Sequence, residues 1–256
     1  MFTKEERDQV RNRLIDLARS DPRVVAGALT GSSGRGAEDE WSDIDIAFGI
    51  TEGISVETVL DDWTEVLTRE QGVLHYWDLP FRSSLYRVFL LPSGLEIDIA
   101  AVPQQEFGPR GPSFRTLFGT ARPQQADPPP SSRFLIGLGW HHALHARSYM
   151  ERGKSWGAEH WISALRDHTL ELACLRLGEE TAHARGAHRL PKDVTESLAE
   201  SLVRSLDYTE LRRALGAATA AYITELEAWD PDLAARLKPL LPSAAPQQPR
   251  TDIRNK

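Results

Sequence analysis

The sequence has little cysteine: Cys174 is its one thiol, so no intramolecular disulfide forms and a zinc site of several thiolates is excluded. Such sparse cysteine suits a reducing compartment. No run of eighteen apolar residues occurs, so a transmembrane helix is not expected. The charged residues 1–7 lack the apolar segment of a signal peptide. We therefore expect a soluble, cytoplasmic protein that does not bind a membrane.

Positive charge is scarce in the first half. Residues 1–120 hold 12 Lys and Arg against 20 Asp and Glu, a net charge of −8, whereas residues 121–256 hold 18 against 17, a net charge of +1, which together give −7. A protein that follows a phosphate backbone usually presents a basic face. The acidic half therefore disfavours a nucleic-acid partner and favours metal cations or a positively charged small molecule.

The hydrophobic fraction of 41% is enough for a folded core. In the first part, apolar periodicity predicts alternating helices and strands, and the order argues for an α/β (α+β) fold with a small mixed sheet. The expected helices are 4–19 and 55–70, and the expected strands are 24–29, 43–48, 84–91 and 95–100, the last two forming a hairpin.

The second part has the pattern of a helical bundle. We expect a catalytic domain over 1–120, a proline-rich linker over 121–131, a helical substrate-binding domain over 132–242 and a disordered tail over 243–256. The expected helices are 132–151, 156–177, 192–205 and 207–229.

One segment carries a chemical pattern. Asp43 and Asp45 are two residues apart, a spacing that places both carboxylates on one face of a strand. Asp98 lies in a similar alternation, and it shares the cleft if its strand is the neighbour. Carboxylates are hard oxygen ligands that suit Mg²⁺, and two such ions can stabilise an in-line displacement at phosphorus. Gly31 and Ser32 follow a predicted strand, where a backbone or hydroxyl can approach a phosphate.

These residues resemble the motif of the DNA polymerase β-like nucleotidyltransferase superfamily over about residues 20–102. The family pattern is a Gly-Ser turn, then Asp-x-Asp on a strand, here within Ser42-Asp43-Ile44-Asp45, then a third carboxylate on another strand. The resemblance implies two Mg²⁺ ions as cofactors, ATP or another NTP as donor and phosphate contacts at the Gly-Ser turn. In such enzymes the third carboxylate, here Asp98, also acts as general base. Ser42 and Arg35 are the further candidates for nucleotide binding, and for Arg35 a structural contact in the loop remains an alternative.

Residues 152–166 resemble the helical domain of the antibiotic-type members, the aminoglycoside and lincosamide nucleotidyltransferases. The resemblance implies that Lys154 reaches the triphosphate and that Glu159 and Asp167 bind a cationic acceptor. Trp156 is a candidate for the acceptor or base pocket, with core packing as its alternative. The implied reaction moves a nucleoside monophosphate onto a hydroxyl of a small molecule.

Other interpretations remain open at this point. The chain is alternatively an inactive or regulatory nucleotide-binding protein of the same fold, resembling an antitoxin, or a transferase that acts on protein or RNA. His141 and His145 are spaced as metal ligands on a helix, but the zincin glutamate is missing, which favours a packed histidine cluster with His142.

Overall fold

The computed structural model describes residues 1–126 and 128–243. The chain divides into two compact units, residues 1–127 and 128–256, and the division falls inside the predicted linker. The predicted tail, apart from residue 243, lies outside the described residues.

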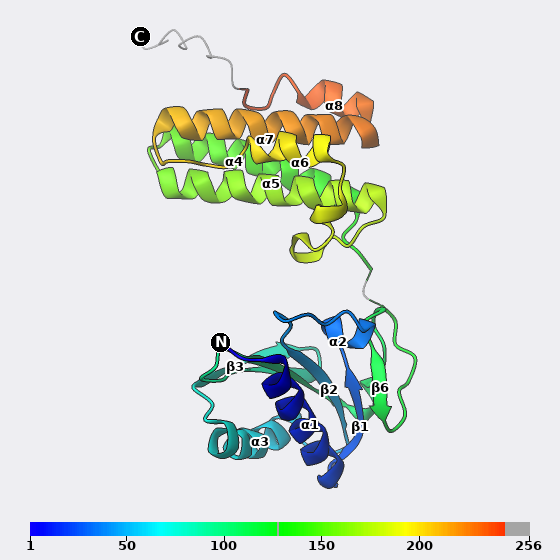
Figure 1. Ribbon diagram of the computed structural model, residues 1–256. Helices are drawn as coiled ribbons and strands as arrows, with labels where there is room; N and C mark the ends of the chain where they lie inside the picture. Colours follow the sequence, from blue (N-terminus) through cyan, green and yellow to red (C-terminus); the bar gives the residue numbers. More distant parts are fainter. Residues whose placement is uncertain (127, 244–256) are drawn as a thin grey trace, which may run out of the picture. The chain divides into compact units, whose positions relative to one another are not determined.

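The first unit combines helices with a sheet of six strands (Figure 1). Both predicted helices and all four predicted strands are present within a few residues of their expected bounds, whereas β3 and β6 were not predicted. The elements are α1 (Lys4–Ser20), β1 (Val24–Leu29), α2 (Gly31–Arg35), β2 (Ile44–Ile50), α3 (Val56–Gln71), β3 (His75–Phe81), β4 (Ser84–Leu90), β5 (Glu96–Pro103), a 3₁₀ turn (Gln104–Glu106) and β6 (Arg115–Phe118).

The sheet is mixed, as predicted, in the order β3-β4-β5-β2-β1-β6. Strands β2 and β5 run parallel, and every other neighbouring pair is antiparallel. The predicted hairpin is the pair β4 and β5, which confirms the prediction for residues 84–100. The parallel pair matters most for the site because it sets β5 beside the strand that follows Asp43.

Helices α1 and α3 cover one face of this sheet. Their apolar side chains pack with alternate residues of the strands, among them Ile44, Ile46, Ile97 and Ile99. This alternation follows from the two-residue period of a strand, which sends the intervening side chains to the opposite face. Asp45 and Asp98 therefore lie on the face turned away from α1 and α3.

That opposite face is lined by smaller side chains. Ala28, Ala47 and Ala100 form a cross-strand row, and Phe107 packs over part of it. The segment after β5 thus covers the part of this face that lies next to Asp45 and Asp98.

The second unit is the predicted helical bundle (Figure 1). One expected helix is shorter than predicted: α6 ends at Ala199, because the Arg213 guanidinium binds the carbonyls of Glu200 and Leu202 instead of leaving them to a continuing helix. The elements are α4 (Ser132–Glu151), α5 (Ser155–Leu177), 3₁₀ turns at Ala182–Ala184 and Ala187–Arg189, α6 (Lys192–Ala199), α7 (Tyr208–Trp229) and α8 (Pro231–Leu237).

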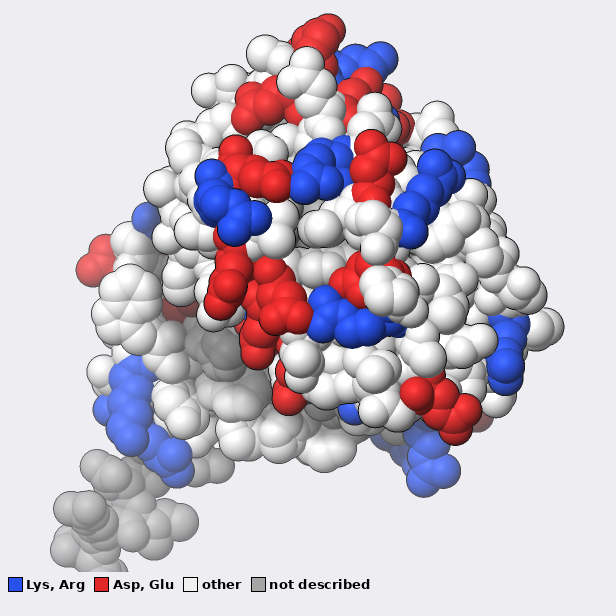
Figure 2. Space-filling view, turned by 90° about the horizontal axis from the view of Figure 1, so that it is seen from below, with Lys and Arg blue, Asp and Glu red and all other residues white. Residues whose placement is uncertain are grey.

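Within the described ranges, none of the helices has the length and apolar character needed to cross a membrane. Acidic and basic side chains are interspersed on the face shown in Figure 2, where red and blue groups lie side by side. Ion pairs also join elements of the first unit, for example Arg13 of α1 with Glu70 of α3 at 2.7 Å. Such surface pairs contribute little to stability individually.

Candidate functional site

The sheet register brings two of the predicted carboxylates side by side. Asp45 of β2 is the direct partner of Asp98 of β5 in the parallel pair. Residues paired in this way on adjacent strands lie about 4.8 Å apart along the hydrogen-bonding direction and share a face. Asp43 precedes the first residue of β2 by one position and interacts electrostatically with Asp98. The expectation that Asp98 lies on a strand next to that of Asp45 is confirmed.

Asp98 occupies an electrostatically unfavourable position. Burial, together with smaller contributions from the negative charges of Asp43 and Glu96, raises the pKa of its carboxyl to about 6. Its buried Oδ1 has no hydrogen-bond partner among the described residues. A buried, unsatisfied carboxylate oxygen is costly in a folded protein, and such an atom is available to a cation or a proton donor from a ligand.

Gly31 lies directly against Asp45. It has a positive φ of +52°, and a Cβ at this position would come within 1.8 Å of Asp45 Oδ2. The Thr30 N–H donates to the Asp45 carbonyl at 3.0 Å, which ties the start of α2 to β2. Glycine is therefore required here by contact with the carboxylate as well as by backbone conformation, a role that the motif alone did not reveal.

Ser32 follows in the first turn of α2. Its Oγ is buried and lacks a hydrogen-bond partner within the described ranges. A buried hydroxyl without a partner costs free energy, as does the Asp98 oxygen. Two buried polar atoms without a hydrogen-bond partner in the described residues, Ser32 Oγ and Asp98 Oδ1, thus belong to segments that lie next to β2.

A buried arginine holds the loop that leads into Asp43. Arg7 of α1 is 1% exposed, and its Nη1 donates to the carbonyls of Asp39 at 2.5 Å and Ser42 at 3.0 Å. The Ser42 hydroxyl donates to Asp39 Oδ1 at 2.9 Å and accepts from the Asp39 N–H at 2.9 Å. Ser42, a predicted nucleotide contact, thus has its hydroxyl engaged within the turn, where it positions Asp43.

Arg35 also makes a structural contact. Its Nη1 donates to the Ser113 hydroxyl at 2.8 Å, and the neighbouring Gly34 lies so close that a Cβ would meet the Ser113 carbonyl group at 2.7 Å. Of the two roles that the sequence left open for Arg35, the structure displays the loop-holding contact.

The donor set suits a divalent cation, since it offers three carboxylates, one with an unsatisfied buried oxygen. Across residues 1–126 and 128–243, no three His, Cys, Asp or Glu side chains are already grouped as metal ligands. Carboxylates of like charge repel one another unless a cation lies between them. We therefore expect these three carboxylates to come together as ligands only when the cation is bound.

Four predicted contacts belong to the second unit. Lys154 caps the start of α5, with its ammonium 5.8 Å from the centroid of the Tyr149 ring. Trp156 is 76% exposed, so core packing is not its role within this unit. Glu159 accepts from the Ser163 hydroxyl at 2.7 Å, and Asp167 is exposed. Contact of these residues with nucleotide or acceptor remains a prediction.

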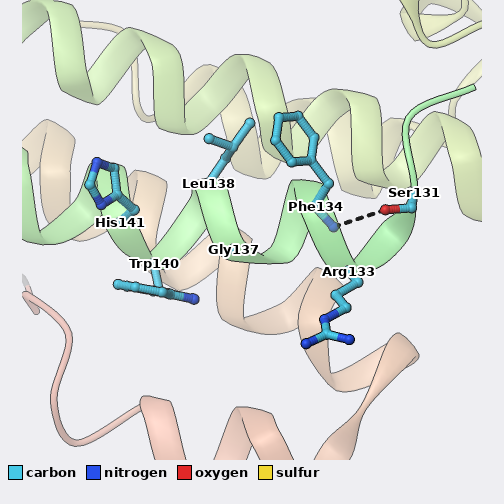
Figure 3. A pocket seen from close by; sticks show the side chains of 7 residues that line it. All are labelled: Ser131, Arg133, Phe134, Gly137, Leu138, Trp140 and His141. Atoms are coloured by element: carbon cyan, nitrogen blue, oxygen red, sulfur yellow. Dashed lines mark hydrogen bonds between the residues drawn. The ribbon is translucent and has the colours of Figure 1, made fainter.

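The second unit also has an open hollow of about 520 Å³ along the first half of α4 (Figure 3). Phe134 and Leu138 point to one side of the helix, and Arg133 and Trp140 to the other. The lining residues, Ser131, Arg133, Phe134, Gly137, Leu138, Trp140 and His141, include no carboxylate among the described side chains. The lining of this hollow therefore lacks the carboxylate ligands that the proposed metal chemistry would use.

The histidines of α4 form a packed aromatic cluster. The rings of His141 and His145 lie 4.2 Å apart, and His142 lies 4.8 Å from Trp161 and 5.0 Å from His168, measured between centroids. His142 is buried, and in the described part of the chain its Nδ1 has no hydrogen-bond partner. Ring packing with Trp161 accounts for the spacing of these histidines.

This cluster makes the helical unit sensitive to acid. Burial lowers the pKa of His142 to about 4, with smaller contributions from the neighbouring histidines. The unfolded chain takes up this proton near pH 6.5 and the folded chain only near pH 4, so stability falls as the pH drops through that window. We expect a loss of about 2 kcal/mol between pH 7 and pH 5.

Thermal denaturation followed by circular dichroism at both pH values measures this loss. A His142→Phe variant is expected to lose most of the dependence, whereas His188→Phe, at an exposed position, is expected to keep it. Equal pH dependence in all three proteins would refute the assignment to His142.

Comparison with known proteins gives structural neighbours only. No family model and no curated protein matches this chain. An aminoglycoside 6-adenyltransferase from Bacillus subtilis is similar at 14% identity and a TM-score of 0.39, over 91% of this chain and 92% of that chain. A nucleotidyltransferase-like protein from Exiguobacterium sibiricum 255-15 is similar at 12% identity and a TM-score of 0.38, over 91% and 80%.

Proposed function

We propose that this protein is a Mg²⁺-dependent nucleotidyltransferase that moves a nucleoside monophosphate, in the simplest case AMP, from an NTP to a hydroxyl of a small molecule. The observation that supports it best is the pairing of Asp45 with Asp98 on parallel strands, beside a glycine that the Asp45 carboxylate requires. This arrangement supplies carboxylates at one point of the sheet next to a Gly-Ser turn.

In the proposed reaction the acceptor hydroxyl oxygen attacks the α-phosphorus, the bond to the β-phosphate oxygen breaks, and pyrophosphate leaves. Asp98 takes the hydroxyl proton on its unpartnered oxygen. Ser32 donates its hydroxyl to a phosphate oxygen of the departing pyrophosphate. Asp43, Asp45 and Asp98 would hold Mg²⁺, which supplies charge stabilisation for the attacking and leaving oxygens when bound.

The acceptor classes that the motif resemblance suggests are the aminoglycosides and lincosamides. The net charge of −8 over residues 1–120 favours a small acceptor over a nucleic acid. In this proposal Lys154 contacts the triphosphate, and Glu159, Asp167 and Trp156 contact the acceptor.

A pyrophosphate-release assay tests the proposal. The full-length protein is incubated with each NTP, Mg²⁺ and a panel of hydroxylated acceptors that includes aminoglycosides and lincosamides. We expect pyrophosphate release in step with acceptor modification, and its loss when EDTA removes the metal. Tight MgATP binding by calorimetry, without pyrophosphate release on any acceptor, would instead indicate a regulatory nucleotide-binding protein.

A further inference from the structure

The residues that continue the pairing from Asp98 onto β4 and β3 are apolar, and part of this apolar surface is exposed. Asp98 of β5 pairs with Val88 of β4, and Val88 pairs with Trp77 of β3. Directly paired residues of adjacent strands share a face. Asp45, Asp98, Val88 and Trp77 therefore form one row on the face opposite α1 and α3.

The neighbouring rows extend the apolar surface. Leu79 pairs with Tyr86, which pairs with Ala100, and on the other side Leu90 pairs with Glu96. We call the surface formed by Trp77, Leu79, Tyr86, Val88 and Leu90 the β3–β4 shelf.

The exposure of this shelf is unusual for a strand. Trp77 is 51% exposed, Leu79 50% and Leu90 39%. The other face of the same strand is occupied, since Asp78 bonds Arg87 and the Arg87 guanidinium lies over the Tyr76 ring. On the carboxylate face, by contrast, Trp77, Leu79 and Leu90 remain exposed within the first unit.

The distances fit a small molecule. Trp77 lies two strands from Asp98, which corresponds to about 10 Å between their backbones. A molecule with one hydroxyl at Asp98 would therefore lay its next ring or alkyl group on Val88 and Trp77. No side chain of the shelf carries a charge, so its contribution to affinity comes from apolar and aromatic contact.

We propose that the β3–β4 shelf binds the acceptor, in addition to the contacts proposed above, and that it takes a hydroxylated small molecule with an apolar or aromatic face. This inference rests on the proposed transferase function and narrows its acceptor class. A polycationic acceptor gains little from such a surface, whereas an amphiphilic acceptor buries its apolar part there and presents its hydroxyl to Asp98.

A binding experiment tests the shelf independently of turnover. Saturation-transfer NMR on the full-length protein uses phenyl β-D-glucoside, which has hydroxyls and an aromatic ring, and methyl β-D-glucoside, which lacks the ring. We expect signal from the phenyl compound alone. It should be lost in Trp77→Ser and retained in Leu74→Ser, a control at a 65% exposed residue just outside β3. Equal signal in Trp77→Ser, or none in the wild type, would overturn the proposal.

Kinetics separate this inference from the general function. Once an acceptor is turned over, Trp77→Ser should raise the acceptor KM about tenfold and leave the KM for MgATP unchanged. An unchanged acceptor KM would refute binding of the acceptor at the shelf and leave the transferase proposal intact. Absence of turnover on every acceptor would refute the transferase proposal, and the NMR experiment would then decide whether the shelf binds such molecules. If sedimentation velocity shows that Trp77→Ser changes the association state, the shelf is an interface between copies and the proposal is wrong.

Discussion

Replacing Asp98 by asparagine is expected to reduce turnover by about a thousandfold or more while the protein remains folded. The substitution keeps the size of the side chain but removes the negative charge and the proton-accepting oxygen. Because the buried carboxylate is destabilised by its surroundings, which raise its pKa to about 6, the melting temperature should not fall below that of the wild type. Asp45→Asn is expected to lose activity to a similar degree.

Glu96→Gln provides the matched control. Glu96 lies on the same strand and face as Asp98, two residues away, but it is exposed. Its amide variant should retain turnover close to that of the wild type in the pyrophosphate-release assay. Wild-type turnover in Asp98→Asn, or an equally large loss in Glu96→Gln, would contradict the assignment of the third carboxylate.

Gly31→Ala is expected to lower kcat/KM by at least about a hundredfold, because a methyl group at 1.8 Å from Asp45 Oδ2 must displace that carboxylate. The positive φ of Gly31 adds backbone strain of about 1 kcal/mol for any residue with a Cβ. Steady-state kinetics and thermal denaturation of the same protein preparation measure the two effects.

Gly36→Ala separates strain from contact. Gly36 ends α2 with a φ of +68°, and no described atom lies within 4 Å of the position that an alanine methyl group would take there. Both alanine variants should therefore carry a similar backbone strain, but Gly36→Ala, which has no steric clash, should keep its activity. If both variants lose activity equally, loop strain rather than the contact with Asp45 explains the effect.

The sequence identified most of the elements that carry the site because each has a strong local signal. The alternation in Asp43-Ile44-Asp45 and in Ile97-Asp98-Ile99 specifies strands with one apolar and one acidic face. Strand β3 escaped prediction: it is an edge strand containing Pro80, and every residue in it is exposed, so its pattern does not match a half-buried strand.

Local pattern also did not reveal how some side chains are used. Ser42 has the motif position of a ligand contact, but the turn formed with Asp39 engages its hydroxyl. The roles of Lys154 and Glu159 depend on contacts that the helical unit by itself does not contain, so they remain predictions.

By itself, the sequence determined the fold class and the candidate acidic residues, because strand and helix periods are local properties of the chain. Only the tertiary structure decided that Asp98 pairs with Asp45, that Gly31 lies against the Asp45 carboxylate, and that Trp77 continues the same row. The physical reason is that strand order and register are set by pairing between segments far apart in the chain, which no local pattern encodes.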